Sequence, residues 1–245
     1  MTTVVPHYDQ AAQNYKIGGL SKTITYPSVL TKATARLKAD TISGGTGPDG
    51  SLKPMGWYSG DCPTHHQRGH LVGNALGGTG DSLDNLVTLT AGSNHPFMYA
   101  IERVVNRYVR SKPLQAFHYE VTCGYSDYVL VEIAKGFWVP TVGNNPMCLF
   151  PAPASLTISL RHWLMGGPGA YISLGELCTG YEDPEAELGH GAATSTTWWI
   201  PNGGYKLNQG IQHTGSYCAG SVNLNTADKN QSAAFVAYAT HLGYV

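Results

Sequence analysis

The sequence is poor in charged residues. Lys, Arg, Asp and Glu make up 13% of the 245 residues, and the formal net charge is −1, whereas about a quarter of the residues of an average soluble protein are charged. A nearly neutral chain lacks the global positive potential of proteins that coat nucleic acid, so that class is excluded. Any contact with a polyanion must depend on a local cluster of basic residues.

The sequence also lacks long apolar runs. No stretch reaches the about 18 consecutive apolar residues of a membrane-spanning helix, and residues 1–10 lack the basic and apolar regions of a signal peptide. We therefore expect a soluble chain with no membrane partner. The low charge favours a secreted protein or a delivered effector.

Cysteine pairs with metal-binding or redox spacing are absent as well. The five cysteines are Cys62, Cys123, Cys148, Cys178 and Cys218. No two of them have CxxC spacing, so the sequence indicates neither a zinc knuckle nor a thioredoxin-type redox pair. Their odd number leaves the redox compartment open.

Apolar residues are sufficient for a folded core. Hydrophobic residues make up 42% and aromatic residues 10% of the chain, without polar repeats, so burial can offset the entropy lost on ordering. The Pro-rich segment 143–155 (GNNPMCLFPAPAS) follows neither a helical nor a strand pattern of apolar residues. We place a domain boundary there, with a main domain at 1–150 and an extension of unknown role at 151–245.

Local patterns predict several elements. Residues 66–72 and 86–90 are predicted strands on either side of the Gly-rich turn GNALGGTG, and the Gly- and Pro-rich stretch 43–60 is a predicted surface loop beside a cleft. Residues 116–123 and 128–134 are expected to pair as an antiparallel hairpin. Short runs beyond 155 (LTISL, AYISL, TTWWI) have strand composition, and 226–241 is a predicted helix.

A helix after residue 96 is the clearest local pattern. Spacings of three and four give it one apolar face, made of Phe97, Ile101, Val104, Val105 and Tyr108. Ser93 or Asn94 is a candidate N-cap, and Pro96 suits the first turn.

The segment 67–102 concentrates groups that suit phosphodiester hydrolysis. Strand alternation puts Arg68 and His70 on one face, where both can address one phosphate. An imidazole with a pKa of about 6.5 is available as a base near neutral pH. The amide oxygen of Asn94 is an acceptable ligand for Mg²⁺, a hard cation that prefers oxygen.

These motifs carry a resemblance to a known family. The texts QRGHLVGNALGG, DNLVTLT and SNHPFMYAIERVV resemble the DNA/RNA non-specific endonucleases of the ββα-metal, or His-Me finger, class, which includes DNA-entry nucleases and bacterial nuclease toxins. The resemblance covers residues 67–105 and extends towards 56 and 135. It implies an α+β fold with a ββα-metal core on an antiparallel sheet, followed here by a C-terminal α/β extension.

The resemblance also implies roles for five residues. His70 matches the general base, Arg68 the arginine that handles the phosphate, and Asn94 the asparagine that holds one Mg²⁺. Asn85 matches an asparagine that supports the site, and Glu102 a helix glutamate that contacts the water shell of the metal.

Further properties follow from the same resemblance. DNA or RNA is the implied substrate, with 5′-phosphate products, and Mn²⁺ is an expected substitute for Mg²⁺. A toxin of this class would have an immunity or inhibitor protein as partner. The motif of the family begins with Asp, whereas this chain has Gln67, whose side chain should lie on the strand face opposite His70.

One geometric limit applies to the metal contacts. Within one regular helix, Asn94 and Glu102 would lie roughly 12 Å apart along the axis. Both cannot then bind one ion directly. Either Glu102 acts through water, or Asn94 precedes the helix and turns back.

Each site residue also has a plain structural interpretation. A lone His on a strand is often a hydrogen-bonded structural residue, and Asn94 could serve as a helix N-cap. Asn85 could shape a turn after Asp84. Glu102 could be an exposed helix residue next to Arg103 or Asn106.

Two other functions compete with a nuclease. One is a secreted module that binds glycans or a protein partner on a decayed nuclease fold, using the aromatic-rich second half. The other is a zinc hydrolase built on His65, His66 and His70. Three imidazoles on one short strand would not all converge on a tetrahedral ion.

Overall fold

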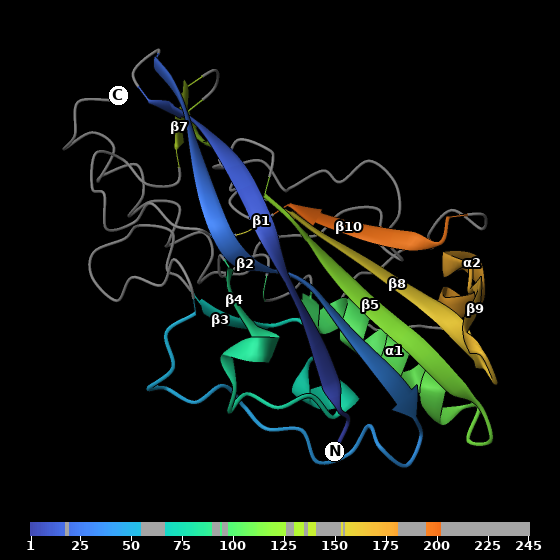
Figure 1. Cartoon of the computed structure of the whole chain (residues 1–245). Helices are drawn as coiled ribbons and strands as arrows, with labels where there is room; N and C mark the ends of the chain where they lie inside the picture. The colour runs from blue at the N-terminus through green and yellow to red at the C-terminus, as the bar shows by residue number, and fades with distance from the viewer. Residues whose placement is uncertain are drawn as a thin grey trace.

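A six-stranded antiparallel sheet forms the frame of the protein (Figure 1). The computed structural model describes residues 1–17, 20–54, 67–89, 94, 98–125, 130–134, 137–140, 153, 155–180 and 195–201. The strand order is β1-β2-β5-β8-β10, and β9 also pairs with β8. The strands are β1 (Val4–Ile17), β2 (Leu20–Lys38), β5 (Ala116–Gly124), β8 (Ser155–Leu164), β9 (Gly167–Tyr171) and β10 (Thr197–Pro201).

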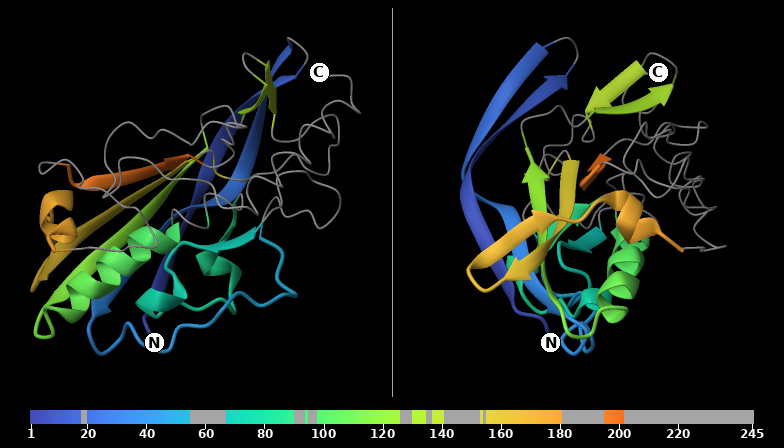
Figure 2. Two further views of the ribbon diagram at one scale, coloured as in Figure 1. Left: turned by 180° about the vertical axis from the view of Figure 1, so that it is seen from behind. Right: turned by 90° about the vertical axis from the view of Figure 1, so that its right-hand side faces the viewer.

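One face of this sheet is apolar, and we call it the inner face. It carries alternate residues of the central strands, among them Ala35 and Leu37 of β2, Phe117 of β5 and Ile158 of β8, all buried. Helix α1 (Tyr99–Arg110) lies against this face, as both views in Figure 2 show. The intervening residues point to the opposite, outer face, which is polar.

A small β-turn-β unit precedes α1. Strands β3 (Gln67–His70) and β4 (Leu86–Leu89) pair antiparallel, with His70 opposite Leu86. Two 3₁₀ turns, η1 (Asn74–Leu76) and η2 (Leu83–Asn85), lie between them. A third sheet joins β6 (Leu130–Ala134) to β7 (Phe137–Pro140), and the short helix α2 (Leu174–Cys178) follows β9.

Several sequence predictions are confirmed. The strands expected at 66–72 and 86–90 are β3 and β4, LTISL and TTWWI lie in β8 and β10, and residues 43–54 form a loop. The helix is α1, with Ile101, Val104, Val105 and Tyr108 buried as its periodicity predicted. Only the first part of AYISL is strand, because β9 ends at Tyr171. The helix expected at 226–241 lies outside the described residues.

The expected hairpin of 116–123 with 128–134 is wrong. β5 pairs with β2 and β8, whereas β6 pairs with β7. The short GYSD connection suggested a local turn, but β5 is long and apolar on one side, so it is paired on both edges in the centre of the sheet. The long hairpin of β1 and β2 was not predicted at all.

The boundary expected near residue 150 does not separate two sheets. β8, β9 and β10 come after it, yet β8 pairs with β5, and Leu156 and Ile158 belong to the same core as Phe117.

Cys123 is a buried free thiol and Cys178 is disulfide-bonded. Across the described residues, no helix has the length and apolar character needed to cross a membrane.

Candidate active site

The five predicted site residues all stand on, or contact, the segment 67–73. Arg68 and His70 belong to its strand, β3. The side chains of Asn85 and Glu102 reach the residues just after His70, and Asn94 reaches the residue at the start of the strand. The β3 segment is therefore where the candidate site is assembled.

His70 is half-buried and held by a backbone carbonyl. Its Nε2 lies 3.1 Å from the carbonyl oxygen of Thr46. Burial lowers the pKa of His70 below its usual 6.5, against the opposing effects of the Thr46 carbonyl and the nearby Asp81. The neutral imidazole is therefore the prevailing form near neutral pH.

The Thr46 carbonyl is positioned by a bonded loop. The backbone N–H of Thr46 donates to Gly78 (3.1 Å), the backbone N–H of Gly80 donates to the hydroxyl of Thr46 (2.9 Å), and Asp49 N–H donates to Gly80 (3.0 Å). The Thr46 hydroxyl also donates to Asp81 (3.2 Å). These bonds join the loop 43–54 to the Gly-rich turn. The sequence predicted the loop, but no pattern in it identified Thr46.

Arg68 is bound to the same loop. Its Nε donates to the carbonyl of Leu52 (2.5 Å) and its Nη2 to the carbonyl of Gly50 (2.6 Å). A guanidinium has five N–H groups in a planar fork, a geometry that matches a phosphate. Arg68 and His70 thus share one loop as well as one strand face.

Asn85 is a buried residue that fixes the chain after His70. Its Oδ1 accepts from the backbone N–H of Val72 (2.8 Å), and its Nδ2 donates to the carbonyls of Val72 and Thr79 (both 2.8 Å). Its own carbonyl accepts from Leu71 N–H (2.9 Å). The side chain therefore binds protein backbone with both of its polar atoms, which is a positioning geometry.

Glu102 is buried in α1, 7% exposed, so the interpretation as an exposed helix residue is wrong. Its carboxylate abuts Gly73, and a Cβ added at Gly73 would lie 2.0 Å from Oε2 and 2.2 Å from Oε1. Burial raises the pKa of Glu102 to about 8. Tyr119 of β5 has a buried hydroxyl with no hydrogen-bond partner in the described part of the chain, and the charge of Glu102 adds to burial in raising its pKa.

Gly73→Ala is expected to destabilise the protein by about 1–3 kcal/mol, because its methyl group would overlap the Glu102 carboxylate in an already packed interior. Urea unfolding measures the change in the midpoint. Gly47→Ala is the matched control, since a Cβ there meets nothing within 4 Å. Equal midpoints for the two variants would contradict the tight contact.

Asn94 is anchored to the start of β3. Its Nδ2 donates to the Oε1 of Gln67 (2.8 Å). The N-cap position of α1 is Met98, with no side-chain cap, so Asn94 is not the cap of this helix and precedes its first residue, Tyr99. Gln67 thus joins the candidate site, although the sequence singled it out only as a departure from the usual motif.

The candidate residues are linked through β3 rather than to one another. Within the described ranges, no hydrogen bond joins any two of His70, Asn85, Asn94 and Glu102, and no three His, Cys, Asp or Glu side chains cluster as a metal site. His65 and His66, on which the zinc alternative depends, lie outside the described residues. The oxygen donors here belong to an amide and one carboxyl group.

The chain was compared with known families and proteins. A family model described as DNA/RNA non-specific endonuclease matches residues 11–137, which is more than half of the chain and includes all five candidate residues. No curated protein matches the chain. The match does not favour a binding module on a decayed nuclease fold.

Similar solved structures include NucA from Streptococcus agalactiae with a bound magnesium ion, at 18% identity, with 89% of this chain and 79% of that chain covered and a TM-score of 0.40. An extracellular endonuclease has 16% identity, 89% and 87% coverage and a TM-score of 0.41. Sda1 nuclease with a bound zinc ion has 13% identity, 67% and 85% coverage and a TM-score of 0.38. On the match over residues 11–137, the chain belongs to the DNA/RNA non-specific endonuclease family.

Proposed function

We propose that the chain is a Mg²⁺-dependent endonuclease without sequence specificity, in which His70 is the general base and Asn94 holds the metal. The observation that carries the proposal is the bond between His70 and the Thr46 carbonyl, within the segment that the family model matches. This bond supports a neutral His70 imidazole in which one identifiable ring nitrogen can accept a proton.

The bond decides which nitrogen is the base. A carbonyl oxygen only accepts hydrogen bonds, so the Nε2 of His70 must carry the hydrogen. In a neutral imidazole the lone pair is then on Nδ1. Nδ1 is therefore the atom that takes a proton from water.

The proposed reaction is hydrolysis with in-line attack. Water bonds to phosphorus through its oxygen as its proton passes to Nδ1 of His70, and the bond from phosphorus to the 3′-oxygen breaks. The 3′-oxygen takes up a proton from solvent, and the products carry a 5′-phosphate and a 3′-hydroxyl. Arg68 binds a nonbridging phosphate oxygen and offsets the charge that develops on it.

The donor atoms fit a hard divalent cation. The Nδ2 of Asn94 is engaged by Gln67, so the oxygen Oδ1 is the atom left for a metal. The buried Glu102 carboxylate would accept a hydrogen bond from water in the shell of the metal, and burial raises its pKa. A bound Mg²⁺, or Mn²⁺ in its place, would supply charge stabilisation to the phosphate and to the departing oxygen.

The wider assignments belong to the same proposal. β3, β4 and α1 follow one another in the order of a ββα-metal core, and we assign that core to them. We propose that 1–150 carries the nuclease chemistry and that 151–245 is an extension that supports or targets it, with β8 completing the same sheet. The Cys178 disulfide supports a secreted or delivered protein. If it is delivered as a toxin, an inhibitor protein is the expected partner.

The test is plasmid nicking with and without EDTA, together with Asn94→Ala. Wild-type protein should nick plasmid in Mg²⁺, lose the activity in EDTA and show no preferred site. Asn94→Ala should need a higher Mg²⁺ concentration for half-maximal rate, because it removes a protein ligand. Gln115→Ala, which removes an exposed amide after the end of α1, is the matched control. An unchanged Mg²⁺ requirement would remove Asn94 from the metal site.

A further inference from the structure

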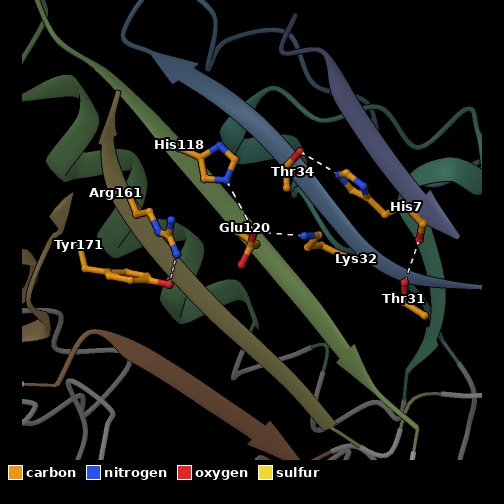
Figure 3. A network of polar contacts seen from close by, with 8 residues as sticks. All are labelled: His7, Thr31, Lys32, Thr34, His118, Glu120, Arg161 and Tyr171. Atoms are coloured by element: carbon orange, nitrogen blue, oxygen red, sulfur yellow. Dashed lines mark hydrogen bonds and ion pairs between the residues drawn. The ribbon is translucent and has the colours of Figure 1, made fainter. Parts of the chain in front are cut away.

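The outer face of the large sheet carries a row of basic groups in direct register. Arg36 of β2 lies opposite His118 of β5, His118 lies opposite Arg161 of β8, and Arg161 lies opposite Tyr171 of β9. Figure 3 shows the His118, Arg161 and Tyr171 side chains of this row in front of α1, on the side away from the helix. We call these four residues the cationic row.

Acidic groups do not balance this row. Among the outward positions of β2, β5 and β8, Glu120 is the one acid, and it is shared between Lys32 (3.6 Å) and His118 (3.7 Å). A chain with net charge −1 nevertheless places an arginine on each side of His118 here. Burial lowers the pKa of His118, against the opposing effect of Glu120, so the two guanidiniums carry the positive charge of the row, and a bound anion would lie between them.

An aromatic ring lies close to each of the two guanidiniums. The Cζ of Arg36 lies 5.3 Å from the ring centre of Trp163, and the Cζ of Arg161 lies 3.9 Å from that of Tyr171. The Nη2 of Arg161 also donates to the hydroxyl of Tyr171 (Figure 3). A guanidinium has five N–H groups, so others remain that can bind an anion. The Nε of Arg161 is buried with no hydrogen-bond partner in the part of the chain that the structure describes.

We propose that the cationic row binds the phosphate backbone of nucleic acid, as a surface separate from the active site. Arg36 and Arg161 are two strand spacings apart, roughly 10 Å, so each guanidinium can contact a separate phosphate of one nucleic-acid strand. The segment 67–73 lies on the inner side of the sheet. The carboxylate of Glu102 contacts Gly73 of this segment, and its charge raises the pKa of Tyr119 in β5. This inference rests on the proposed nuclease function, because the surface would hold the nucleic acid that the active site cleaves.

The experiment measures how binding depends on salt. Fluorescence anisotropy would follow a labelled duplex of about 30 base pairs, roughly 100 Å long, in EDTA to prevent cleavage. The test variant is Arg36→Gln with Arg161→Gln. The control is Arg110→Gln with Lys112→Gln at the end of α1, which also removes two charges and one cation–ring contact, that of Lys112 with Tyr108.

The test variant should lower the slope of log K against log salt by about two, since each phosphate contact contributes about 0.9. The control should keep the wild-type slope. If Arg161→Gln impairs folding, the exposed Arg36→Gln alone should lower the slope by about one. Equal slopes for wild type and Arg36→Gln would overturn the proposal. Plasmid nicking in Mg²⁺ tests the nuclease separately, so an inactive protein that still shows the slope change would refute the function but not the surface.

Discussion

His70→Ala is expected to slow phosphodiester cleavage by on the order of 10² to 10⁴-fold, the usual contribution of a general base. The side chain is half-buried and bonds to a loop carbonyl, so its removal opens little of the core. Initial rates of plasmid nicking and a thermal melt measure the two effects.

His162→Ala is the matched control, because His162 lies on β8 beside Phe117 and far in the sequence from β3. It should retain nearly full activity. A His70→Ala rate within tenfold of the wild-type rate would remove His70 from the mechanism.

The pH dependence of the wild-type rate tests the same assignment. Because burial lowers the pKa of His70 below 6.5, the basic form persists to more acidic pH, and the rate should fall only below that value. The His70→Ala residual rate should lack this acid limb.

Glu102→Gln is expected to raise stability at neutral and alkaline pH while lowering activity. An acid whose pKa rises from 4.5 in the unfolded chain to about 8 in the folded protein binds its proton more tightly when folded. Stability is therefore fully present below pH 4.5 and is lost as pH rises towards 8, at about 1.4 kcal/mol per pH unit. A neutral amide of similar shape avoids that loss.

Urea unfolding in EDTA between pH 4.5 and 8 measures the effect, because a bound cation would favour the ionised carboxyl. The wild-type midpoint should fall across this range, and the Glu102→Gln midpoint should fall much less. Asp40→Asn removes one exposed carboxylate from the end of β2 and should behave like wild type. If Glu102→Gln followed the wild-type curve, the carboxyl would be solvated rather than buried.

The helix and the two short strands of the site were predictable because their signals are local. The apolar residues of α1 recur at spacings of three and four, and β3 and β4 flank a Gly-rich turn, so each pattern needs only neighbouring residues. The long β1–β2 hairpin escaped prediction because Pro6, Pro27 and scattered polar residues interrupt its alternation.

The sequence by itself determined the family, since its motifs are those of the family whose model matches residues 11–137, and the proposed site residues Arg68, His70, Asn85, Asn94 and Glu102 come from those motifs. Tertiary structure decided what each side chain meets. Local propensity carries no information about partners distant in sequence, and burial depends on the whole packed core. The Thr46 carbonyl on His70, the contact of Glu102 with Gly73, and the cationic row across β2, β5, β8 and β9 therefore exist only once the sheet has formed.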